Sequence, residues 1–252
     1  MEKGDLLFYV QRSGCFDENN EYLKLGRIRL RLDPNSFGEH SDFRQELKLQ
    51  QGHIEITGIN REVEVKILVW AEAHRPVVYL EIECSQAVHA EVAYESWRNN
   101  DIELSNDGKN SRFGCFSWDE YPGQVVRYKD GVSHQGNAAL AYHRNRDDKL
   151  LFDFMVRQQG LESAGNDLIN TQKGRTFGRL LTGTGFAPAG SDKGEYIGTP
   201  HKAWKLRSES VRSFHTVKLY THLAQTETLD ESLTDLNVLA TVVDPSDREA
   251  RK

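Results

Sequence analysis

The fold class is decided by two neighbouring segments, Tyr79-Leu80-Glu81-Ile82-Glu83 and Val88-His89-Ala90-Glu91-Val92-Ala93-Tyr94-Glu95-Ser96-Trp97. Apolar and polar side chains alternate along both with a period of two, which is typical of a β-strand that has one buried and one solvated face. The same alternation occurs at residues 53–57, 62–67 and 213–223. The sequence therefore predicts an antiparallel, all-β protein.

Further strands are expected at residues 4–10, 26–32, 138–143, 150–157, 177–183 and 202–207. The 252 residues can bury a substantial core, and neither a composition break nor an internal repeat divides them. About a dozen strands in one unit favour two large packed sheets. The expected fold is therefore a two-sheet antiparallel sandwich.

Two regions depart from the strand pattern. Residues 98–136 hold many turn formers with aromatic residues among them, which indicates a long loop that is functional or ordered by its own side chains. The only good helix candidate is C-terminal, where Asp230 can cap a helix over residues 231–242 that presents an apolar stripe. Pro245 is expected to end this helix.

Composition excludes several classes of partner. A net charge of −6 does not suit a protein that binds nucleic acid, and no segment approaches the roughly 20 apolar residues that span a bilayer. Cys15, Cys84 and Cys115 are widely spaced, which favours free thiols over one disulfide with a spare cysteine, and over a zinc site. The first residues lack the layout of a signal peptide, so we expect a cytoplasmic protein if Met1 is the start and an exported one if a parent protein carries a leader.

Paired carboxylates are the first candidates for chemistry. Glu81 and Glu83 would share one strand face, as would Glu62 and Glu64, but alternating glutamates are more typical of the solvated face of a sheet. Asp119 and Glu120 are better placed, because they lie in the long loop.

Aromatic residues flank this acidic pair. Trp118 and Tyr121 could form an exposed platform on which a sugar ring stacks, so the candidate carbohydrate contacts are Trp118, Asp119, Glu120 and Tyr121. Trp97 and Trp204 continue strand patterns and are expected in the core.

Nine histidines raise the possibility of an aldose epimerase, which needs a histidine acid and a carboxylate base. The candidates are His143, His215 and His222, although a structural role is favoured for each. No histidine pair has metal-ligand spacing, and the glycines at 178, 183 and 185 do not precede a helix as a phosphate-binding loop requires. We therefore expect neither a metal nor a cofactor.

Several segments taken together carry a family resemblance. They are residues 4–10, 13–20, 23–29, 43–49 and 70–73, with Arg157-Gln158-Gln159-Gly160-Leu161-Glu162, Gly174-Arg175-Thr176-Phe177-Gly178 and Gly183-Thr184-Gly185-Phe186. They resemble the N-terminal domain of unknown function 5703, common in Bacteroidetes glycan-degrading proteins. That domain is similar in layout to the N-terminal β-supersandwich of family 95 α-L-fucosidases, which leads through a helical linker into a catalytic (α/α) barrel.

The resemblance implies a galactose-mutarotase-like β-supersandwich over residues 1–228 and a helical linker over residues 229–252. It implies that an (α/α) barrel of the parent protein carries the catalytic carboxylates, so that no catalytic residue falls in this chain. Members usually have a segment before Gly4 that this sequence lacks, and the sequence stops before any barrel, so we expect a piece of a larger protein.

The leading hypothesis is the non-catalytic N-terminal portion of a bacterial glycoside hydrolase that acts on an oligosaccharide or polysaccharide. A stand-alone carbohydrate-binding module and an aldose epimerase are the alternatives.

Overall fold

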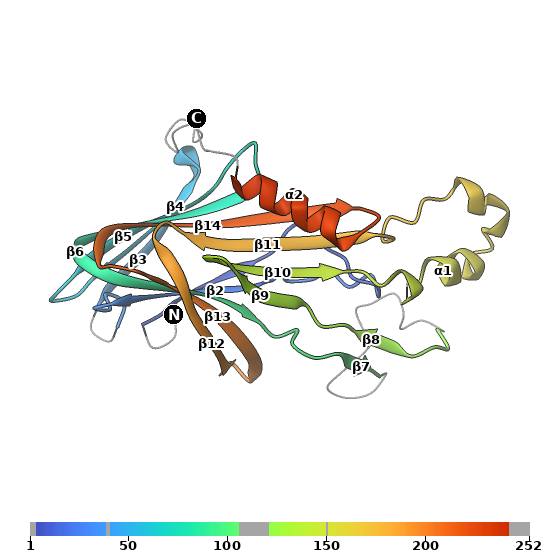
Figure 1. Ribbon diagram of the computed structural model, residues 1–252, viewed down its shortest axis with the longest axis horizontal. Coiled ribbons are helices and arrows are strands. Elements are labelled where there is room, and N and C mark those ends of the chain that lie inside the picture. The colour runs from blue at the N-terminus through green and yellow to red at the C-terminus, as the bar shows by residue number, and fades with distance from the viewer. Residues whose placement is uncertain (1–3, 39–40, 106–120, 150, 242–252) are drawn as a thin grey trace.

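The computed structural model describes residues 4–38, 41–105, 121–149 and 151–241. Twelve of its described strands form one continuous sheet that is folded into two packed layers, a large sheet and a small sheet, and two short strands pair separately (Figure 1). The large sheet has the spatial order β3 (Asp42–Lys48), β4 (His53–Ile59), β5 (Glu64–Ala71), β6 (Val77–Ser96), β14 (Arg212–Gln225), β11 (Arg175–Gly183), β10 (Ala138–Arg144) and β9 (Gly131–Gln135). The small sheet has the order β1 (Leu6–Val10), β2 (Gly26–Asp33), β6, β13 (Thr199–Ser208) and β12 (Phe186–Tyr196). All pairings between these strands are antiparallel, as the alternating sequence predicts.

Strand β6 belongs to both sheets. Its first half pairs with β5 and β14, and its second half pairs with β2 and β13. The register with β14 shifts between Phe214, which lies opposite Glu83, and Arg212, which lies opposite Val88. The extra residues between Glu83 and Val88 form a bulge, which bends the strand and lets it pass from one sheet to the other. The two segments that predict the fold class are thus the two halves of one strand of 20 residues.

The main core lies between the two sheets. Most even-numbered side chains of β6, from Leu80 through Val92, pack there against apolar residues of both sheets, whereas Gln86, within the bulge, is exposed. Glu64 and Glu83 are exposed on the other side of their strands, Glu62 is exposed in the turn before β5, and Glu81 is half-buried. This agrees with the interpretation that these acids form a solvated face.

Helix α2 (Leu229–Thr241) covers part of the outer face of the large sheet, across β14 and β11 (Figure 1). Leu236 is 0% exposed and packs with Leu180 and Tyr220, while a Cβ on Gly178 would approach its Cδ2 to 2.9 Å. The glycine on β11 therefore leaves the space that Leu236 fills. The predicted C-terminal helix is confirmed.

The cap of α2 differs from the expected one. The Thr228 hydroxyl accepts a hydrogen bond from the Glu231 amide at 3.3 Å, and the Glu231 carboxylate accepts one from the Thr228 amide at 3.4 Å. This reciprocal capping box begins the helix at Thr228, so the prediction that Asp230 is the cap is wrong. The expected stop at Pro245 lies outside the described residues.

The prediction of a strand at residues 150–157 is wrong, because Phe152–Gln158 forms helix α1. Gly160, with φ +65°, ends this helix in the left-handed conformation, and the Leu161 amide donates to the Val156 carbonyl at 2.9 Å. Alternate apolar residues at 152, 154 and 156 resemble a strand, but Met155 interrupts that alternation. A helix in this segment puts Phe152 and Met155 on one face.

The long excursion expected at residues 98–136 is partly strand. Short strands β7 (Ile102–Leu104) and β8 (Val125–Arg127) pair with each other, and β9 joins the large sheet. Trp204 lies in the main core, as expected, whereas Trp97 is only partly buried. Cys15 and Cys84 are free, buried thiols, as predicted, and burial raises the pKa of each to about 11. Cys115 lies outside the described residues.

Candidate functional site

Hydrogen bonds join residues 14–19 to three distant parts of the chain at the end of the sandwich from which α1 projects, which we call the loop end (Figure 1). The side-chain amide of Asn145 donates to the Phe16 carbonyl at 3.1 Å, and the Arg175 guanidinium donates to the Gly14 carbonyl at 2.8 Å. The side-chain amide of Asn19 donates to the Val126 carbonyl at 2.8 Å. Residues far apart in the sequence are therefore held side by side at this end.

Residues 15–23 form a tight hairpin within the loop end. The Leu23 amide donates to the Cys15 carbonyl at 3.0 Å, and Phe16 and Tyr22 form a β-bridge. At its tip, the Asp17 carboxylate accepts hydrogen bonds from the backbone amides of Asn19 and Glu21, while Asn20 adopts a positive φ of 56°. A side chain that bonds the backbone amides of its own turn fixes the hairpin without help from a sheet.

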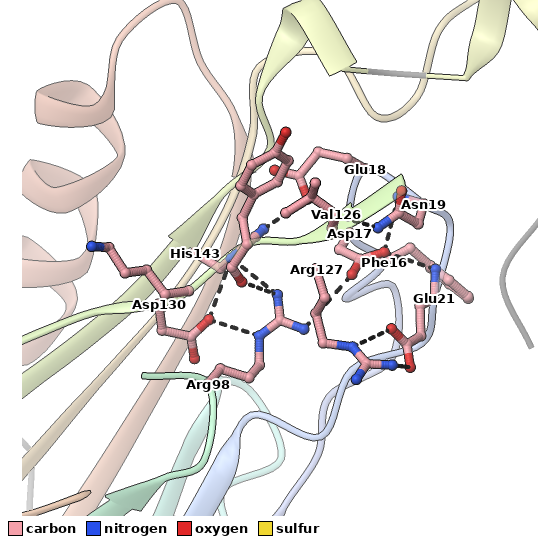
Figure 2. A network of polar contacts seen from close by, with 12 residues as sticks. Phe16, Asp17, Glu18, Asn19, Glu21, Arg98, Val126, Arg127, Asp130 and His143 are labelled. Carbon is pink, nitrogen blue, oxygen red and sulfur yellow. Dashed lines mark hydrogen bonds and ion pairs between the residues drawn. The ribbon is translucent and has the colours of Figure 1, made fainter. Parts of the chain in front are cut away.

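A buried ionic network lies beneath the hairpin (Figure 2). Asp130 stands near its centre: it accepts a hydrogen bond from Arg98 Nε at 3.0 Å and pairs through its other oxygen with Arg179. Burial alone would raise the pKa of Asp130, but the charges of Arg179 and Arg98 and a hydrogen bond from His143 hold it well below its ordinary range. Asp130 is therefore an anion that binds cations.

His143 bridges Asp130 and the hairpin (Figure 2). Its Nδ1 lies 3.3 Å from the Asp130 carboxylate, and its Nε2 lies 3.2 Å from the Glu18 carboxylate. Burial alone would lower the pKa of His143, but these two carboxylates raise it above its ordinary value. We assign His143 as an imidazolium that donates to both carboxylates, which leaves the 3.3 Å approach of Arg98 Nη2 to Nδ1 as a contact between cations.

Glu18 and Asp17 respond differently to burial. Burial alone would raise the pKa of Glu18, but His143 and the amide of Arg146 hold it below its ordinary value. Burial raises the pKa of Asp17 to about 6, because Arg98 approaches its Oδ2 only to 3.7 Å and that oxygen accepts no hydrogen bond. The network therefore holds one carboxylate whose ionisation is unfavourable in the folded chain.

This difference predicts a pH dependence for the variant Asp17→Asn. The folded-state pKa of Asp17 lies above its unfolded value of 3.8, so the folded chain binds the Asp17 proton more tightly than the unfolded chain does. The contribution of this proton to the free energy of unfolding is complete below pH 3.8 and is lost as the pH rises through about 6. The stability of the wild type should fall relative to Asp17→Asn by about 2 kcal/mol between about pH 4 and pH 7. Guanidinium titrations at both pH values measure this difference. The exposed Asp42→Asn should show no such trend, and a flat difference for Asp17→Asn would contradict the raised pKa.

The network is suited to support rather than to acid–base catalysis. Asp17 and Glu18 are 0% and 2% exposed, and each carboxylate of the network is already engaged by backbone amides or by cations. A general acid must reach a substrate proton within hydrogen-bond distance. Glu18 lines one of the clefts described below, but its two oxygens already contact His143 and the backbone amide of Arg146. The buried charges instead fix the loops in one arrangement.

All three histidines considered for an epimerase lie in the part of the chain that the structure describes. His143 is buried in the network, and the buried His215 lies with its Nε2 3.0 Å from the carbonyl oxygen of Val88. His222 lies 3.9 Å from Asp235 of α2. Burial lowers the pKa of both His215 and His222. A structural role for these three histidines stays a prediction.

The predicted carbohydrate contacts are only partly described. Trp118, Asp119 and Glu120 lie outside the described residues. Tyr121 is partly buried and makes an edge-to-face contact with Phe154 of α1, with ring centroids 5.1 Å apart. A role for these four residues in sugar binding stays a prediction.

Three clefts open around the loop end, on the surfaces that the network supports. The first, of about 190 Å³, has an apolar floor of Leu151, Phe152 and Met155. The second, of about 590 Å³, we call the acidic cleft; its charged residues are Asp147, Lys173, Glu227 and Glu231. The third, of about 270 Å³, we call the aromatic cleft; it is lined by Glu21, Tyr22, Lys24, Trp97, Arg98 and Arg127.

Sequence reasoning missed the network. One signal was available: Arg179 lies inside the apolar segment Phe177-Gly178-Arg179-Leu180-Leu181, and a charge in a buried strand needs a partner. Within the described ranges, the histidines, cysteines and acids form no cluster that could hold a metal ion. The helices of those same ranges include none that is long and apolar enough to cross a membrane.

Comparisons with known proteins give a family but no curated relative. No curated protein matches the chain. Among solved structures it is similar to a protein described as a kojibiose phosphorylase from the human microbiome, at 10% identity and a TM-score of 0.42, covering 99% of this chain and 30% of that one. It is also similar to a bacterial glucoamylase in complex with acarbose, at 7% identity and a TM-score of 0.36, covering 84% and 29%.

The chain thus spans about 30% of the length of these two solved structures. A scan of protein families matches residues 1–252 to the N-terminal domain of DUF5703, described as a domain of unknown function. The match covers the whole sequence, as the motif resemblance predicts. The chain belongs to the DUF5703 N-terminal domain family.

Proposed function

We propose that this chain is the non-catalytic β-sandwich portion of a larger enzyme that cleaves glycosidic bonds in a polysaccharide or other glycan. An (α/α) barrel domain of the same parent protein supplies the catalytic carboxylates, and the residues after Thr228 lead towards it. Membership of the DUF5703 family supports this proposal, together with the resemblance of that family to the N-terminal supersandwich of family 95 α-L-fucosidases.

One observation carries the proposal: the buried acids of the loop end are used to hold structure. The carboxylates of Asp17, Glu18 and Asp130 bind backbone amides or cations inside the protein. Two of the more accessible acids of the acidic cleft are engaged as well, because Asp147 accepts from the Gly174 amide at 2.8 Å and Glu231 caps α2. A sandwich whose acids are engaged in this way is suited to support loops at the edge of a partner's substrate cleft.

An activity assay tests the proposal directly. The purified chain, incubated with aryl glycosides and oligosaccharides in the presence and absence of inorganic phosphate, should release no sugar above the buffer rate. The variant Glu227→Gln serves as the control, since Glu227 is an acid of the acidic cleft whose side chain caps no helix. Turnover by the wild type that is lost in Glu227→Gln would show that the chain carries its own catalytic acid, and the proposal would fail.

The epimerase alternative is tested in the same preparation. Because His143 is buried and each of its ring nitrogens lies against a carboxylate, polarimetry should give the uncatalysed rate of glucose and galactose mutarotation. Carbohydrate binding without turnover is the second candidate function, and the aromatic cleft favours it.

A further inference from the structure

The aromatic cleft presents two aromatic side chains near a pair of charged ones. Tyr22 is 45% exposed, and Trp97, which directly follows β6, is partly buried. The Trp97 ring packs at a tilt against Tyr9, with centroids 6.1 Å apart. Flat aromatic rings offer large contact area at little cost in conformational entropy, and the C–H faces of a pyranose ring pack well on them.

The walls of the aromatic cleft are fixed in advance. Tyr22 is held by its bridge to Phe16 and stacks on that ring, with centroids 5.0 Å apart and an interplanar angle of 27°. Arg127 of β8 donates two hydrogen bonds to Glu21, at 2.8 and 2.7 Å, so the guanidinium plane is set by a bidentate pair. A site whose side chains are already ordered loses little entropy when a ligand binds.

The charge of the aromatic cleft is opposite to that of the whole chain. Arg127 pairs with the one carboxylate of the cleft, Glu21, and the charge of Arg98 is directed inward to Asp130. Lys24 pairs with no carboxylate that the structure describes, and its Nζ lies 5.3 Å from the centroid of the Tyr9 ring. The cleft therefore carries a net positive charge on a protein of net charge −6. The acidic cleft has the reverse balance, with three carboxylates and Lys173.

We propose that the aromatic cleft binds a pyranose ring that carries an anionic group, either the carboxylate of a uronic acid or a sulfate ester. The ring stacks on Trp97 and Tyr22, and Lys24 and Arg127 attract the anionic group. A volume of about 270 Å³ is small for a ligand pocket and suits a single sugar unit. This inference rests on the proposed function for its glycan context, and it names the class of glycan.

Isothermal calorimetry of the intact chain tests the inference. The probes are oligosaccharides of galacturonate and of glucuronate, a sulfated galactose oligosaccharide, and the neutral oligosaccharides of galactose and glucose. Saturable binding of an anionic probe is expected, with neutral probes bound at least about tenfold more weakly, and with affinity that falls as salt is added. Whichever anionic probe binds identifies the group as carboxylate or sulfate.

Variants locate the binding in the cleft. Trp97→Ala should weaken binding about tenfold through loss of stacking, and Lys24→Ala should weaken it about threefold and reduce the salt dependence. Lys173→Ala removes a cation of the acidic cleft and should leave binding unchanged. A thermal melt of each variant separates loss of binding from loss of fold, and Lys24→Ala, whose side chain is exposed, tests the charge without disturbing the core.

Three results would overturn the inference: no saturable heat with any anionic probe, equal affinity for the neutral probes, or wild-type affinity in both Trp97→Ala and Lys24→Ala. Turnover of a probe would instead count against the proposed function. The two proposals therefore fail separately.

Discussion

Replacement of Asp130 by asparagine should destabilise the chain by about 3 to 5 kcal/mol. Asp130 pairs with Arg98, Arg179 and His143, and all four side chains are buried. Asparagine keeps the shape but offers one neutral oxygen and an N–H₂ group that faces cations. The variant therefore leaves buried positive charges without their anion, which costs far more than the net contribution of the ion pair.

Guanidinium unfolding of Asp130→Asn against the wild type measures this loss. The matched control is Asp192→Asn, which breaks an exposed pair with Lys205 and should change stability by less than about 1 kcal/mol. A loss of under about 1 kcal/mol for Asp130→Asn would mean that water reaches the network, contrary to the burial described above.

Truncation of Leu236 to alanine is the second substitution with a large expected effect. Leu236 is 0% exposed and fills the space over Gly178, between α2 and the large sheet. Removal of its side chain should cost about 2 to 5 kcal/mol, because burial is lost and a cavity remains. Thermal or denaturant unfolding measures this, with Val238→Ala as the control, since Val238 lies on the same helix and is 55% exposed.

The outcome bears on where the sandwich ends. If Leu236→Ala unfolds with the wild-type midpoint, α2 contributes nothing to the sandwich and acts only as a connection. A large loss makes α2 part of the sandwich and moves the start of any connecting segment beyond Thr241. The boundary predicted after residue 228 would then fall too early.

Alternation of side chains was enough to predict the sandwich. Most strands, such as β4 and β14, have one face in the main core, and burial of that face sets a period of two that a sequence shows directly. Helix α1 was not predicted, because a short apolar segment fits both the strand period of two and the helical period of about 3.6 residues. Gly160 marked the helix end, but a glycine by itself also marks a turn.

The candidate site could not be predicted in the same way. The network brings together Asp17, Arg98, Asp130, His143 and Arg179, which come from five separate segments, and no local pattern records that they meet. Asp130 precedes Gly131 within the region of turn formers at residues 98–136, a pattern that indicates a turn and not a buried anion. Long-range hydrogen bonds position the loops, whereas periodic burial positions the strands. A sequence shows periodic burial directly but does not show which distant residues will form hydrogen bonds, so strands are easier to predict than the arrangement of loops.

Strand β6 carries a consequence for how the protein moves. Because one continuous backbone supplies a central strand to each sheet, neither sheet can slide or separate without breaking hydrogen bonds in the other. Shear between packed layers, a common mode of domain motion, is therefore blocked along this strand. We therefore expect the two layers of the sandwich to move together, so that force applied at the loop end reaches both of them.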